Sequence, residues 1–127
     1  MSQAAAQAAA FYREVADTGI LWTIRDDAGF PAPLTQGGKR ALPFWSSRAR
    51  AEKIVNTVAA YSGFQVLPVS WQEFCKQWVP GLREDGLLVG VNWSGVRALG
   101  YDLEPEELAA IVRMRMEQGE MEQPGKA

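Results

Sequence analysis

Histidine is absent from this chain of 127 residues, and cysteine occurs only once, as Cys75. Without histidine, Ser–His and Cys–His nucleophilic pairs are excluded, and the commonest metal ligand is missing. A single cysteine excludes an intramolecular disulfide and a zinc site built from cysteines and histidines. The chain also has neither a phosphate-binding glycine-rich loop nor a dinucleotide fingerprint. We therefore expect no catalytic residue, no metal and no cofactor.

Long hydrophobic runs and an excess of basic charge are missing as well. The 13 basic and 15 acidic residues give a net charge of −2, whereas nucleic-acid binding depends on basic side chains that neutralise phosphates. No stretch reaches the roughly 20 apolar residues of a membrane span, and residues 1–10 lack the basic start of a signal peptide. We therefore expect no nucleic-acid partner, no membrane and a cytoplasmic location.

The chain does contain enough apolar material for one core, since 47% of its residues are hydrophobic. This composition predicts a single domain over residues 1–118, followed by a polar, disordered tail over 119–127. Apolar residues recur at helical spacing in four segments, at about 3–17, 48–61, 71–79 and 105–118. Runs rich in β-branched and aromatic residues predict strands at 20–24, 30–34, 40–45, 64–69, 87–91 and 96–101.

These segments predict an α+β fold, with a mostly antiparallel sheet of five or six strands and three or four helices packed on it. Turn signals at 26–29 and 36–39 favour a meander of the first three strands, and 92–95 reads as the hairpin between the last two. Ser70 and Glu73 have the spacing of a capping box, which predicts a helix start. Pro80 and Gly81 are expected to end that helix.

Two groups of titratable residues have structural explanations. Cys75 shares an apolar helical stripe with Trp71, Phe74 and Trp78, which predicts a buried and inert thiol. The acidic pairs at 26–27 and 84–85 lie beside glycines at predicted chain reversals, so turn chemistry accounts for them.

Positive charge gathers around the predicted helix start at Ser46 and Ser47. It comes from five residues, Lys39, Arg40, Arg48, Arg50 and Lys53. A helix N-terminus with hydroxyl groups and nearby arginines is a ready anion site. The alternative is a solvated basic face on which one serine simply caps the helix.

The tryptophans are the second set of candidates. Helical spacing explains Trp71 and Trp78, but it explains neither Trp45, at a predicted strand end, nor Trp93, in a predicted hairpin. Exposed aromatic residues are typical of partner-binding surfaces. Tryptophan also covers the edges of small cores, so both interpretations are open.

Several ordered blocks resemble a known bacterial family, domain of unknown function 2750. The blocks are 42–45, 64–69 with 71–74, 78–82 and 85–91, and the acidic turn at 26–29 also agrees. The resemblance covers residues from about 15 to 108. It implies a small, single-domain α+β protein, and it implies no activity, cofactor or catalytic residue.

The leading hypothesis for function is a non-enzymatic module that binds another protein or itself through the surface from Trp45 to Arg50. It depends on an exposed patch of aromatic and arginine side chains in a chain without catalytic groups. The alternative is a binder of a small anionic ligand at the Ser46–Ser47 helix start, held by Arg48 or Arg40. An enzyme ranks third, because it would need carboxylates that converge in a pocket.

Overall fold

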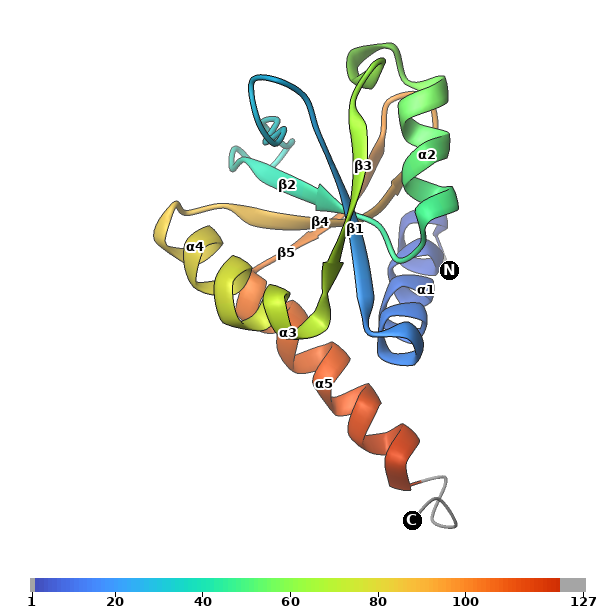
Figure 1. Cartoon of the computed structure of the whole chain (residues 1–127), viewed down its shortest axis with the longest axis vertical. Helices are drawn as coiled ribbons and strands as arrows, with labels where there is room; N and C mark the ends of the chain where they lie inside the picture. Colours follow the sequence, from blue (N-terminus) through green and yellow to red (C-terminus); the bar gives the residue numbers. More distant parts are fainter. Residues whose placement is uncertain (1, 122–127) are drawn as a thin grey trace.

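The computed structural model describes residues 2–121, which form one α+β domain (Figure 1). Its helical elements are α1 (Gln3–Thr18), α2 (Arg48–Thr57), a 3₁₀ turn η1 (Ala59–Tyr61), α3 (Trp71–Glu73), a π-helical segment η2 (Phe74–Trp78), α4 (Val79–Glu84) and α5 (Pro105–Met121). Its strands are β1 (Ile20–Arg25), β2 (Ala41–Phe44), β3 (Gln65–Ser70), β4 (Leu88–Ser94) and β5 (Leu99–Leu103). The predicted strand at 30–34 does not form, and Leu34 makes only an isolated bridge with Arg40.

The five strands form two sheets rather than one mostly antiparallel sheet. β1 pairs with β3 antiparallel, whereas the second sheet has the order β2-β4-β5, in which β2 and β4 are parallel. The predicted meander is therefore wrong. The observed strands β1 and β2 are separated by residues 26–40, which are too many for a tight hairpin to impose their pairing. All four residues of β2 are buried, as is typical of a strand enclosed on both faces.

The two sheets meet where β1 and the end of β2 run side by side. Trp22 and Trp45 exchange both backbone hydrogen bonds there, at 2.8 and 2.7 Å. Two apolar clusters fill the interior on either side of this junction. The first includes Phe11, Val15, Phe44, Val91 and Leu108, and the second includes Ile24, Trp45, Ala51, Ile54 and Trp93.

The predicted helix starts and the first helix end are confirmed, but two other helix ends are not. The segment predicted at 48–61 forms α2 only as far as Thr57, and the separate 3₁₀ turn η1 follows it. Gly19 ends α1 at φ 70°, and Ser47 and Ser70 cap α2 and α3 through their side chains. Pro80 lies inside α4 instead of ending the helix. The reason is η2, where the Val79 N–H bonds to the Phe74 carbonyl five residues back. This wider turn starts a new α-helical segment, so Pro80 falls in a first turn that does not need its N–H.

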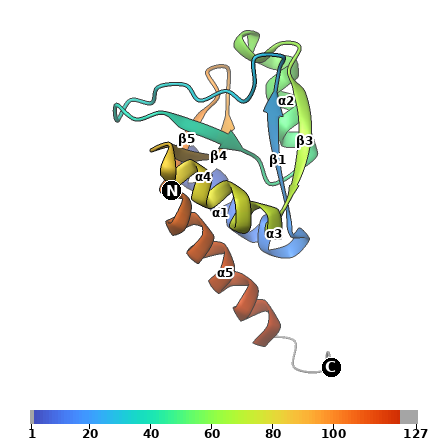
Figure 2. The same ribbon diagram turned by 60° about the vertical axis from the view of Figure 1, so that its left-hand side comes forward.

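The C-terminal half also differs in two details from expectation. β4 continues through Asn92 and Ser94 with a bulge, so the reversal before β5 lies at 95–98 rather than 92–95. α5 includes residues 119–121 of the predicted tail, and residues 122–127 lie outside the described part of the chain. Figure 2 shows α5 extending away from both sheets, at the opposite end of the molecule from α2.

Candidate functional site

Trp45, the main residue of the predicted partner surface, is buried. Only 1% of it is exposed, and its indole Nε1 donates to the Trp93 carbonyl at 2.9 Å. Trp93 is 4% exposed and Ser46 is also buried. The expected exposure of Trp45 is therefore wrong, because the two unexplained tryptophans pack together in the second core cluster.

At the start of α2, the predicted anion site is occupied by a carboxylate of the same chain, that of Glu14 from α1. Ser47 caps the helix by accepting the Arg50 N–H at 3.2 Å, while Ser46 donates its hydroxyl to Glu14 at 2.7 Å. Arg50 donates to both Glu14 oxygens, from Nε at 3.1 Å and from Nη2 at 2.9 Å. The hydrogen bonds from Arg50 are the main reason that the pKa of Glu14 lies below its ordinary value.

Buried Asn92 completes this half-buried polar network. Its Oδ1 accepts the Ser46 N–H at 2.9 Å, and its Nδ2 donates to the Gln7 carbonyl at 3.1 Å. Its φ of 48° is one that asparagine tolerates better than most residues. Gln7, Glu14 and Asn92 carry no local spacing signal, so sequence reasoning missed them. The network fastens α1 and β4 to the corner between β2 and α2.

Arg40 and Arg48, the predicted anion ligands, do not converge. They flank opposite ends of β2, and Arg40 donates to the Ala32 carbonyl at 2.9 Å. Arg48 pairs with Glu52 at 2.7 Å and lies over the ring of Trp22, 5.8 Å from its centroid. An aromatic–arginine contact thus exists beside α2, but its aromatic residue is Trp22 rather than Trp45.

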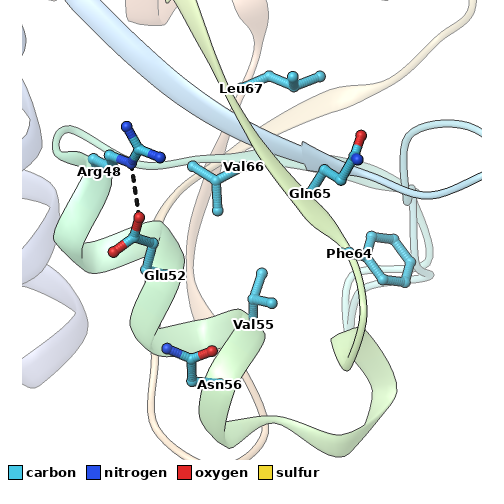
Figure 3. Close-up of a pocket in the computed structure, with 8 residues that line it drawn as sticks. All are labelled: Arg48, Glu52, Val55, Asn56, Phe64, Gln65, Val66 and Leu67. Carbon is cyan, nitrogen blue, oxygen red and sulfur yellow. Dashed lines mark hydrogen bonds and ion pairs between the residues drawn. The ribbon is translucent and has the colours of Figure 1, made fainter.

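A groove of about 540 Å³ opens beside Arg48, between α2 and β3 (Figure 3). Its walls are Arg48, Glu52, Val55, Asn56, Phe64, Gln65, Val66 and Leu67. Figure 3 shows Val55 and Val66 pointing toward each other, whereas Gln65 and Leu67 point to the other side of the strand. Residues 64–67 all line the groove, although side chains alternate between the two faces of a strand. The backbone edge of β3 therefore forms part of the groove wall.

The hydrogen-bond pattern shows which backbone groups face outward at this edge. Trp22 directs both its N–H and its C=O to Trp45, so its pairing with Pro68 on β3 carries no hydrogen bonds. Pro68 and, by the period of two, Val66 must then face away from β1. β3 has no strand partner on that side within residues 2–121. Pro68, which has no N–H, is in the edge position that proline tolerates.

Two further cavities of about 340 and 330 Å³ share the side chain of Trp93 as a wall. Asp102 lines the smaller one and accepts the Trp93 indole N–H at 2.9 Å. Burial raises the pKa of Asp102, and the bond from Trp93 partly offsets this. Neither cavity, nor the groove beside β3, is lined by more than one carboxylate. Across residues 2–121, no three Cys, Asp or Glu side chains could hold a metal ion together.

The structure also shows the surroundings of Cys75 and of Asp26, in the acidic pair at 26–27. Cys75 is half-buried against the first core cluster, and burial raises the pKa of its thiol although Arg113 lies 3.8 Å away. Asp26 accepts the Ala28 N–H at 2.9 Å, which agrees with its predicted turn role.

The fold and these cavities define a small α+β domain with a surface groove beside an open strand edge. The sequence model of the family described as "Protein of unknown function (DUF2750)" matches residues 8–111. The chain belongs to that family, as its ordered blocks predicted. A comparison with curated proteins found no match. No helix within residues 2–121 is both long enough and apolar enough to cross a membrane.

Proposed function

We propose that this protein is a non-enzymatic interaction module that accepts an extended segment of another protein along the open edge of β3. The observation that carries the proposal is the outward-facing backbone of Val66, at the wall of the groove between α2 and β3. Addition of a strand to such an edge is a common mode of peptide recognition, in which backbone bonds supply affinity and side-chain pockets supply specificity.

The available backbone groups favour a foreign peptide over a second copy of the chain. An antiparallel peptide would accept the Val66 N–H and donate to the carbonyls of Phe64, Val66 and Pro68, four hydrogen bonds in all. A second copy of β3 centred on Val66 would keep only two of these. Its proline has no N–H, and its Phe64 N–H is already bonded to the Tyr61 carbonyl.

The side chains beside the edge indicate the partner's chemistry. The peptide residue opposite Val66 would point to the same face as Val66, toward Val55 of α2. An apolar residue fits that position. Arg48 and Glu52 neutralise each other at the groove, so the surroundings favour a peptide segment without strong net charge.

A displayed library of random peptides, selected against the full chain, tests this proposal. We expect selected peptides to place an apolar residue at the centre and to shift the amide resonances of residues 64–67 in a ¹⁵N titration. Asn56 is exposed and lines the groove, so the large ring introduced by Asn56→Trp would fill the groove and abolish peptide binding. Ala110→Trp places the same ring on an exposed position of α5 and serves as the matched control. Peptides that bind both variants equally would contradict the proposal.

This proposal keeps the idea of an interaction module but moves it from Trp45 to the neighbouring groove, with Arg48 retained. The alternative, a small anionic ligand at Ser46 and Ser47, has less support because Glu14 already takes the hydrogen bonds there. A cytoplasmic location is part of the proposal and rests on the single cysteine.

A further inference from the structure

The cavity of about 340 Å³ between α2 and the end of β4 combines apolar walls with positive charge. Its apolar lining comes from Trp45, Ile54, Trp93 and Val96, and Val96 is 85% exposed at the turn before β5. Its charged lining comes from Arg50 and Lys53. The volume lies at the lower end of the range for ligand pockets, about 300–1,000 Å³.

The charge in this cavity has one sign. No aspartate or glutamate is among its lining residues. Arg50 is held in place by Glu14 and by Gln7, whose Oε1 accepts from Nη1 at 2.6 Å. These bonds use three of the five guanidinium N–H groups and leave two for another acceptor. Lys53 has no ion pair among residues 2–121, so its ammonium charge is not compensated.

We infer that this cavity binds a small organic carboxylate with an apolar body. The carboxylate would lie against Lys53 and the two remaining N–H groups of Arg50, and the apolar body would contact Ile54 and the two tryptophans. A neutral molecule would leave the lysine charge without a partner, and a bare inorganic anion would leave the apolar walls unused. This site is separate from the groove beside β3, so either can fail without the other.

The probe for this inference is 3-phenylpropionate, with 3-phenylpropionamide as its neutral counterpart. Titration of the ¹⁵N-labelled full chain follows the five indole N–H signals, which Trp→Phe variants assign one by one. We expect the acid to move the signals of Trp45 and Trp93 in a saturable way while those of Trp71 and Trp78, outside this cavity, stay in place. The amide and inorganic phosphate are each expected to bind at least about fivefold more weakly.

A matched pair of lysine variants separates the charge effect from general effects. Lys53→Met is expected to weaken binding of the acid about three- to fivefold, because the ion pair is near solvent. Lys76→Met removes an exposed lysine elsewhere and should change nothing. The inference is overturned if no indole signal moves at about 20 mM acid, where even millimolar binding saturates. Equal affinity for the amide, or an unchanged affinity in Lys53→Met, overturns it too.

Discussion

Glu14 of α1 and Arg50 of α2 are joined by two hydrogen bonds, at 3.1 and 2.9 Å, although 36 residues separate them along the chain. The pair closes the corner at which Ser46 and Asn92 also meet. One half-buried ion pair thus connects the N-terminal helix to both the start of α2 and the three-stranded sheet.

Glu14→Gln should lower the free energy of unfolding by about 1–2 kcal/mol at pH 7, because charged hydrogen bonds become neutral ones. The folded-state pKa of Glu14 lies below its ordinary 4.5. Its stabilisation is therefore present above pH 4.5 and is lost as the pH falls through the lower, folded-state pKa. Urea unfolding at pH 7 and about pH 3 measures this, and the difference between the two proteins should be smaller at the lower pH. Arg13→Met, which removes an exposed contact at 3.8 Å, should cost under about 0.5 kcal/mol.

Gly90→Ala should destabilise the protein by at least about 2 kcal/mol through overpacking. An added Cβ would lie 2.2 Å from Cε2 of Trp93, whose ring is held by Asp102. Thermal or urea unfolding measures the loss, and the cost should shrink in a Trp93→Phe background if the ring is its cause. Gly119→Ala is the matched control. Apart from its chain neighbours and the nearby backbone of α5, no atom lies within 4 Å of its added Cβ, so helix propensity should make the protein slightly more stable.

Asp102→Asn should raise the free energy of unfolding at pH 7 by about 0.5–1 kcal/mol, since its amide oxygen can still accept from Trp93 without carrying a half-buried charge. The pKa of Asp102 is raised above 3.8 in the folded state. The wild-type protein therefore gains stability as the pH falls through that raised pKa, and the advantage of the variant should fade toward pH 3.8. Urea titrations between pH 7 and 4 measure it, and an unchanged difference across that range would refute the assignment.

Local rules explain which parts of the fold were predictable. The caps at Ser47 and Ser70 and the left-handed Gly19 depend on neighbours within a few residues, so the sequence displays them directly. The division into two sheets arises because β2 forms its ladder with β4, more than 40 residues later, rather than with β1, the preceding strand in the sequence. Burial of both faces of β2 favours this pairing, and the spacing of apolar residues along the sequence does not reveal it.

The same distinction applies to the candidate sites. Arg48 and the basic face of α2 were visible because they are consecutive in sequence. Glu14 and Asn92 were not, since each is a lone polar residue whose partners lie on other elements. The groove beside β3 was also hidden, because an outward-facing backbone edge follows from the pairing of Trp22 with Trp45.

Proline substitutions at adjacent positions of β3 test that edge directly. The Val66 N–H faces away from β1, so Val66→Pro removes no ladder hydrogen bond, just as natural Pro68 removes none. Leu67 is the next residue and directs its N–H to β1, where it pairs with Thr23. We expect Leu67→Pro to cost about 3 kcal/mol or more and Val66→Pro only about 1 kcal/mol, mostly from lost packing against α2.

Chemical denaturation of both variants gives these free energies, and hydrogen exchange provides a second measure. In the wild-type protein the Val66 amide should exchange much faster than those of Leu67 and Val69, because it has no ladder partner. Val66→Pro should also lose the selected peptides while keeping its fold, since the one outward N–H of the groove is gone. Equal costs for the two prolines, or slow exchange at Val66, would mean that this edge is not open and that β3 cannot accept a partner strand.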